Sequence, residues 1–520
     1  MKCKSPVYFF ILLFLSCPIY GQSIKFGSRE KADFQNYEPR IRGEDESSLY
    51  VADVFLSDVI LESFDKRTLK KNYHKEYRII PKHGIKSILE LKRTLFIDGY
   101  FVLFVSGQYF DDSHSELYVH RFKASTGEKE SMDTLMYTRI EDLPIISTQQ
   151  KLANRLGRYQ IQASPDKEHI VIHYANLHYE IGRFFEQIVV LDKELQVVKN
   201  KEFVQEKESQ LIPKGIEVDN EGSIYYIDGN ELVFRDIYQD YEEWREPLPT
   251  DLFESNASPV DITGAFNPAG NLIVTASYLT EDTEDTDENK EGKETREGDT
   301  QIEGMVFLEV DGFNKEIVKA KVSRFDKTFL DEFKDKYHVK RGQDAEFNNI
   351  LSRFRYSFTD NYTILIGHSV PGLIGTGMYM YGSVVVFCFD EEGTLSWAHR
   401  IPKFQIFKTN WKSTLTGYQN YLDDDYLYIF FQDDEDSFEG NKRNVLKLKT
   451  LDNNKHAVPV VYKFNLKTGK MEYDLMRRWD TDEKLKLDPH YGYQGEVGEP
   501  LYIFGKHKKH YRISRIDLRK

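Results

Sequence analysis

The sequence contains very little cysteine. Of its three cysteines, Cys3 and Cys17 lie near the start, and only Cys388 lies in the remainder of the chain. A mature protein that keeps one cysteine cannot form an internal disulfide, so its stability has to come from a packed core. Cys388 stands in the apolar stretch SVVVFCFD. We therefore predict a buried, unreactive thiol at this position.

Long apolar runs are also scarce. The run at Val7–Leu15 follows Lys2 and Lys4 and precedes small and turn-forming residues, a pattern typical of a secretory signal peptide. It has about half the length that a bilayer span requires. We predict a signal peptide over 1–21, an exported chain (periplasmic or extracellular) and no transmembrane segment in the mature chain. Cys17, in FLSC, leaves a lipid anchor as an alternative.

The chain has fewer basic residues than acidic residues. The chain has 70 Lys and Arg residues against 85 Asp and Glu residues, which gives a net charge of −15. An acidic surface repels phosphate backbones, so we expect no nucleic acid partner. The sequence also lacks a Gly-rich phosphate-binding motif and the cysteine spacing of a metal site. We expect no cofactor, with calcium as the one possibility left open.

What the sequence does contain is a repeated turn followed by an apolar strand. We call the two strands that flank this turn A and B. The pattern occurs seven times, at Ile97–Gly107, Ser164–Ala175, Asp219–Gly229, Asn267–Ser277, Thr359–Ser369, Asp423–Asp433 and Gly498–Gly505. Most copies precede a second pair of apolar strands, C and D, joined by a turn, as in QIVVLDKELQVVKNKEF. Four antiparallel strands in a repeat of roughly 40–60 residues are typical of a β-propeller blade.

The ends of the chain bear on the number of blades. Asp58–Ile79 has the C–turn–D form without a clear A–B pair before it, and Leu501–Gly505 and Tyr511–Leu518 read as strands. Strands from both termini would then complete one blade and close the ring, which removes exposed sheet edges. We predict an all-β chain with an N-terminal arm at 22–48 and a single β-propeller at 49–520. We favour seven blades, with six or eight as alternatives.

The turns SPDKE, DNEGS and NPAGN, with their strand order, resemble those of TolB-type and WD-repeat-like propellers. The resemblance extends from Leu49 to Lys520 and concerns architecture. It implies the fold and no particular function, because propellers have many functions.

The connections differ in length between the two faces of the predicted ring. The A–B and C–D turns are short and share one face, which we call the short-turn face. The B–C and D–A connections include an acidic loop at 279–304, for which we predict disorder, and an insertion at 323–349 with a helical pattern. They share the opposite face, the long-loop face. Insertions on one face of a repeat protein often mark its binding surface.

One long connection is apolar and glycine-rich. The segment PGLIGTGMYMYG over 371–382 carries six residues that could contact a partner: Leu373, Ile374, Met378, Tyr379, Met380 and Tyr381. In the alternative interpretation, these residues fold back and plug the centre of the ring.

Another long connection begins with acids. Asp433, Asp434, Glu435 and Asp436 follow an apolar strand and are candidate calcium ligands, because Ca²⁺ prefers clustered oxygen atoms. The alternative is an acidic run that contacts only water and mobile counterions.

We identify no catalytic residues in the sequence. GHSVPG at Gly367–Gly372 resembles a nucleophile elbow, but Pro371 replaces the second glycine and no helix follows. His169 and His173 lie on one side of a strand. For both histidines we favour hydrogen bonds between blades over metal binding.

These observations favour an exported, non-catalytic module that binds a protein, peptide or glycan on its long-loop face. The alternative is a propeller enzyme with a calcium-assisted hydrolase or lactonase-type site at the mouth of the channel.

Overall fold

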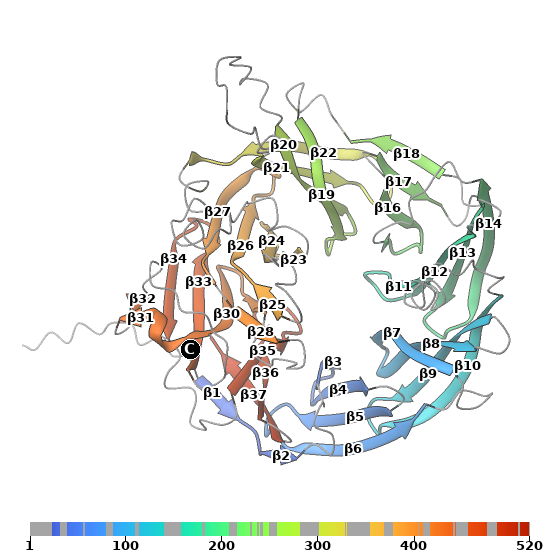
Figure 1. Ribbon diagram of the computed structural model, residues 1–520, viewed down its shortest axis with the longest axis horizontal. Coiled ribbons are helices and arrows are strands. Elements are labelled where there is room, and N and C mark those ends of the chain that lie inside the picture. The colour runs from blue at the N-terminus through green and yellow to red at the C-terminus, as the bar shows by residue number, and fades with distance from the viewer. Residues whose placement is uncertain are drawn as a thin grey trace, which may run out of the picture.

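The computed structural model is built almost entirely of strands (Figure 1). It describes residues 23–31, 39–55, 58–79, 87–109, 114–139, 158–178, 183–206, 216–228, 231–236, 239, 243–248, 257–280, 301–327, 329, 354–368, 378–403, 405–408, 417–439, 442–443, 456–475, 486–507 and 510–518. The predicted signal peptide with Cys17 lies outside these ranges, as do most of the acidic loop and most of the 323–349 insertion.

Eight antiparallel blades stand around a ring in the described part of the chain (Figure 1). In each blade, strand A is the innermost and strand D the outermost. Blades one to four are formed, in A to D order, by β3 (Ile41–Glu44), β4 (Ser48–Phe55), β5 (Asp58–Asp65) and β6 (Lys71–Arg78); β7 (Ser87–Ile97), β8 (Tyr100–Tyr109), β9 (His114–Lys123) and β10 (Glu128–Arg139); β11 (Arg158–Ala163), β12 (His169–His178), β13 (Arg183–Asp192) and β14 (Val197–Glu206); and β15 (Glu217–Val218), β16 (Ile224–Asp228), β17 (Glu231–Arg235) and β18 (Glu243–Pro247).

Blades five to eight follow the same order, with one difference in the last blade. They are formed by β19 (Ala257–Phe266), β20 (Leu272–Thr280), β21 (Gln301–Val310) and β22 (Ile317–Arg324); β23 (Arg355–Phe358), β24 (Thr363–His368), β26 (Val384–Phe389) and β27 (Leu395–Ile401); β29 (Gln419–Leu422), β30 (Tyr426–Asp434), β33 (Ala457–Asn465) and β34 (Met471–Leu475); and β35 (Lys486–Tyr493), β36 (Leu501–His507), β37 (His510–Asp517) and β1 (Ser23–Phe26). The difference is that β1, from the other end of the sequence, supplies strand D, and the short β2 (Glu30–Lys31) also pairs with β37.

The predicted count of seven blades is therefore wrong, because blade one already has its own A and B strands, β3 and β4. Two features hide them in the sequence: β3 has only four residues, and the turn after it contains neither Gly nor Pro. Instead, one carboxylate forms the turn. Asp45 Oδ1 accepts hydrogen bonds from the backbone N–H groups of Ser47 (2.8 Å) and Ser48 (2.7 Å). The 22–48 segment thus supplies strands to blades one and eight.

In blades three to seven, the A–B turns identified in the sequence form as tight turns held by a side chain. In blade four, Asp219 Oδ1 accepts from the backbone N–H groups of Glu221 (3.0 Å) and Ser223 (2.8 Å). Gly222, between them, has φ of 85°, a conformation that favours glycine. Because these turns are compact, they place the start of each B strand directly beside the end of its A strand.

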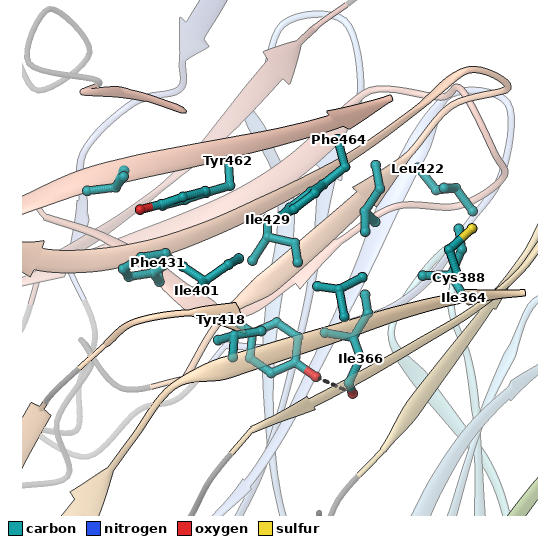
Figure 2. Packing of buried hydrophobic residues seen from close by; sticks show 14 of the residues in the cluster. Ile364, Ile366, Cys388, Ile401, Tyr418, Leu422, Ile429, Phe431, Tyr462 and Phe464 are labelled. Atoms are coloured by element: carbon teal, nitrogen blue, oxygen red, sulfur yellow. Dashed lines mark hydrogen bonds between the residues drawn. The ribbon is translucent and has the colours of Figure 1, made fainter. Parts of the chain in front are cut away.

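The hydrophobic core lies largely between neighbouring blades. Figure 2 shows the cluster between blades six and seven, where the ring of Phe464 packs near Ile429 and Cys388. Tyr418 also donates a hydrogen bond to the carbonyl oxygen of Ile366 (2.9 Å), which joins the two blades. Cys388 is fully buried, and this burial raises the pKa of its thiol. The burial of this thiol predicted from the sequence is confirmed, and its lack of reactivity stays a prediction.

Two aromatic residues of the 323–349 insertion, Phe325 and Phe329, pack onto the propeller. Lys327 and Phe329 are helical, and the side chain of Asp326 accepts a hydrogen bond from the N–H of Phe329 (2.7 Å). The ring of Phe329 is buried against Phe325 and Phe387, with centroids 4.8 and 5.8 Å away. Within the ranges given above, no helix is long and apolar enough to cross a membrane.

Candidate functional site

The apolar candidate residues lie partly on a strand outside the blades. Met378, Tyr379, Met380 and Tyr381 form β25 (Met378–Tyr381), which pairs with β28 (Gln405–Lys408) of the following connection. Leu373 and Ile374 lie outside the described residues. The contact role of these six residues stays a prediction.

A buried glutamine connects this two-stranded sheet to blade seven. Gln405, which pairs with Tyr381, is fully buried, and its Nε2 donates to the carbonyl oxygen of Gln432 (2.6 Å). Gln432 in turn donates to the carbonyl oxygen of Leu487 in blade eight (2.7 Å). Since Asp433 is the next residue, the fold brings the apolar strand and the acidic run onto adjacent elements.

The acidic run forms the end of β30 and a turn of 3₁₀-helix. Asp433 and Asp434 are buried, whereas Glu435 and Asp436 are exposed. Asp434 Oδ1 caps the turn by accepting from the N–H of Asp436 (2.9 Å), and Asp433 Oδ1 accepts from the N–H of Asp434 (2.9 Å). Burial, with Asp436 and Asp433 nearby, raises the pKa of Asp434. Two of the four acids therefore support the local turn.

No group of three or more His, Cys, Asp or Glu side chains that could hold a metal ion occurs within the described ranges. Calcium binding by this acidic run therefore stays a prediction.

The two candidate histidines form hydrogen bonds. The Nδ1 of His169 lies 3.0 Å from the carbonyl oxygen of Asn220 in blade four. The Nε2 of His173 lies 2.6 Å from Glu186 Oε1, and Glu186 Oε2 accepts from Arg235 of blade four (2.7 Å). The predicted hydrogen bond between blades is confirmed for His169, whereas His173 bonds to Glu186 of its own blade and reaches blade four only through the contact of Glu186 with Arg235.

A set of polar side chains on the innermost strands was not predicted. Two of the strands concerned contain β-bulges: Arg42 is the extra residue between the pairs Ile41–Val51 and Gly43–Tyr50, and Lys92 precedes Arg93 in a similar bulge of β7. A bulge changes the direction in which a side chain points and is frequent beside functional sites.

Arg42 is half-buried and lies in an electropositive environment. Its burial lowers its pKa to about 10, and the charges of Arg40 and Arg93 add to this effect, while Asp53 opposes it. The Nε of Arg42 is buried and has no hydrogen-bond partner. Two further guanidinium groups therefore lie close enough to Arg42 to disfavour its charged form, with one carboxylate opposing them.

A chain of side chains continues from Arg93 across three blades. Arg93 Nη2 donates to Gln162 Oε1 (3.4 Å), and Gln162 Nε2 donates to Glu217 Oε2 (3.3 Å). Burial raises the pKa of Glu217 to about 7, although Gln162 and Arg93 oppose the shift. We call Arg40, Arg42, Arg93, Gln162 and Glu217 the inner-wall cluster.

The short-turn face also contains a hollow. A pocket of about 290 Å³ between blades one and two is lined in part by Glu44, Asp98 and Lys123. Its aromatic side includes Tyr50 and Phe96, whose rings stack with centroids 5.4 Å apart. The short-turn face therefore also has a pocket.

Comparison with known proteins identifies fold similarity. No family model matches the chain, and no curated protein matches it. The solved structures similar to it include the Dos1 propeller (8% identity, 95% of both chains covered, TM-score 0.40) and the polysaccharide lyase Uly1 (10% identity, 94% and 100% covered, TM-score 0.35). A third is the β-propeller domain of the Trilobed protease from Pyrococcus furiosus (10% identity, 82% and 93% covered, TM-score 0.32). The eight blade sheets of the described residues show that the chain is a β-propeller.

Proposed function

We propose that this chain is an exported, non-catalytic binding module that contacts a protein, peptide or glycan with the long-loop face of blades six and seven. The supporting observation is that connections on this face form their own secondary structure. β25 pairs with β28, and β31 (Phe438–Glu439) pairs with β32 (Lys442–Arg443).

Ordered connections suit a binding role for an energetic reason. A flexible loop loses conformational entropy when it binds, whereas a segment already held in a strand pair loses less. The anchor from Gln405 to Gln432 holds β28 against blade seven. The Met and Tyr residues of β25 supply apolar and aromatic groups of the kind that contribute strongly to interfaces.

The proposal can be tested by capture from the exported fraction of the source organism. The wild type is compared with a Tyr379→Ser/Tyr381→Ser double variant and with Phe313→Ser as a matched control. Phe313 is an aromatic residue that is 80% exposed on a C–D turn of the short-turn face. We expect the double variant to lose at least about tenfold in capture of the wild-type partner, as is common for an interface hot spot. The control should retain it.

Equal capture by the wild type and the double variant, with unchanged melting curves for both, would reject β25 as the contact surface. Loss of capture by Phe313→Ser alone would place the contact on the opposite face.

A second candidate function is the propeller enzyme, and Glu217 is the observation that favours it. A carboxyl group with a pKa near 7 suits general acid–base catalysis at neutral pH. Hydrolysis of simple lactones and esters by the wild type and by Glu217→Gln tests this role. Melting with calcium and then with EDTA tests the calcium-assisted form separately, and an unchanged melting temperature would count against it.

A further inference from the structure

The inner-wall cluster contains an excess of positive charge. The charges of Arg40 and Arg93 both act on Arg42, and Asp53 is the one carboxylate named among the groups that act on it. Bringing like charges together is unfavourable, and more so where burial reduces the screening by water. The whole chain is strongly acidic, with a net charge of −15, so this local excess runs against its overall composition.

The backbone around Arg42 fixes where this charge lies. The bulge in β3 makes Arg42 the residue without a partner across the strand pair. On the next residue, Gly43, the ring of Phe96 from blade two occupies the space where a Cβ atom would lie. The innermost strands of blades one and two are therefore in close contact. Arg93 lies on that second strand and is exposed to solvent.

Two features of this cluster indicate that its guanidinium groups can form further hydrogen bonds. The Nε of Arg42 is buried without a hydrogen-bond partner, and a buried donor left unpaired costs free energy. The hydrogen bond from Arg93 to Gln162 is long, at 3.4 Å. An oxyanion could accept from both guanidinium groups, because the planar fork of arginine matches two oxygens of one carboxylate, phosphate or sulfate.

We propose that the inner-wall cluster binds an oxyanion of a small ligand. This oxyanion is a carboxylate, phosphate or sulfate group, and Arg42 and Arg93 from adjacent blades hold it. This site is separate from the β25 surface. Substitutions in β25 therefore leave oxyanion binding unchanged if both proposals hold, and either proposal can fail alone.

Thermal melting with defined anions tests the proposal. The probes are sodium citrate, sodium phosphate and sodium sulfate, each compared with sodium chloride at the same low ionic strength. For the wild type we expect at least one of the three to raise the melting temperature by about 1–2 °C at about 10 mM, as linkage to a weak site predicts for a chain of this length. Comparing the melting-temperature rise in citrate with the rises in phosphate and sulfate distinguishes a carboxylate ligand from the other oxyanions.

Two variants and one control give the test its specificity. Arg42→Met and Arg93→Gln should each weaken anion binding about tenfold or more, while Arg324→Gln should not. Arg324 is 59% exposed on the outermost strand of blade five and controls for the loss of one charge. We also expect Arg42→Met to melt above the wild type without anion, because it removes a repelled guanidinium group.

The results that would overturn the proposal are specific. One is a wild-type response that follows ionic strength and is the same in chloride. Another is an anion response in Arg93→Gln that equals that of the wild type. If Arg42→Met fails to fold, Arg93→Gln alone is sufficient for the test.

Discussion

The Nε2 of His173 lies 2.6 Å from Glu186 Oε1, and both side chains are at most 2% exposed. The second carboxylate oxygen of Glu186 accepts from Arg235 of the next blade. Burial alone would raise the pKa of Glu186, but the hydrogen bond from His173 and the charge of Arg235 outweigh it, so the pKa is lowered. This ionised carboxylate therefore links blade three to blade four.

We predict that Glu186→Gln lowers the free energy of unfolding by about 3 kcal/mol, because it removes a charge partner from buried Arg235. Urea denaturation at pH 7 measures this. The matched control is Glu168→Gln, which removes an exposed ion pair with Lys193 in the same blade and should change stability by less than about 0.5 kcal/mol. Equal losses in both variants would contradict the buried network.

Glu217 predicts a dependence of stability on pH with a definite sign. Its pKa is about 7 in the folded chain, against an ordinary value of 4.5, so the folded state binds more protons between these values. Stability should therefore fall as pH rises from 4.5 to 7, by about 1–3 kcal/mol from this group, and level off above 7. Glu217→Gln should flatten that part of the wild-type curve. An unchanged difference between pH 5 and pH 8 in the variant would argue against this origin.

The pairing of β1 with β37 predicts that the first described strand stabilises the last blade. Ile24 of β1 packs against the core of blades seven and eight. Ile24→Asn should cost about 1–3 kcal/mol, since it places an amide at a partly buried apolar position. Lys31→Ala in β2 is the control and should be nearly neutral. If Ile24→Asn has no effect on the melting temperature, β1 does not contribute to closing the ring.

The cap made by Asp434 predicts a smaller effect. Asp434→Ala removes the acceptor for the N–H of Asp436 and should destabilise by about 1 kcal/mol. Asp434→Asn keeps an acceptor oxygen and should be milder. If calcium binds at this run, both variants should also abolish the calcium-dependent rise in melting temperature. A calcium response retained by Asp434→Ala would exclude Asp434 as a ligand.

Much of the fold was predictable because its turns use a small set of residues with known preferences. The seven A–B turns all form, and SPDKE at Ser164–Glu168 is the A–B turn of blade three. The missed blade has a turn made by Asp45 without glycine or proline, in a segment whose A strand has four residues. Short strands leave too little alternation for the pattern to be recognised.

The inner-wall cluster could not be predicted for a different reason. Arg42, Arg93 and Glu217 come from three separate blades. Arg42 lies at a bulge of its strand, and Arg93 is connected to Glu217 only through Gln162 of the blade between them. A bulge depends on how two strands pair, so neither strand's own sequence shows it. By contrast, the prediction of a hydrogen bond between blades succeeded for His169, whose partner Asn220 lies in the turn of the next blade.

The origin of the two pairing strands in blade eight has a consequence for the order of folding. Within the described residues, β1 precedes every other blade strand in the sequence, and its partner β37 follows all of them. The outer edge of the last blade therefore stays unpaired until the strands of the other blades have been synthesised. Such long-range pairing is slow, because the chain entropy is lost before the contact forms. We therefore expect a folding intermediate in which seven blades have all their strands and the eighth still presents an open edge.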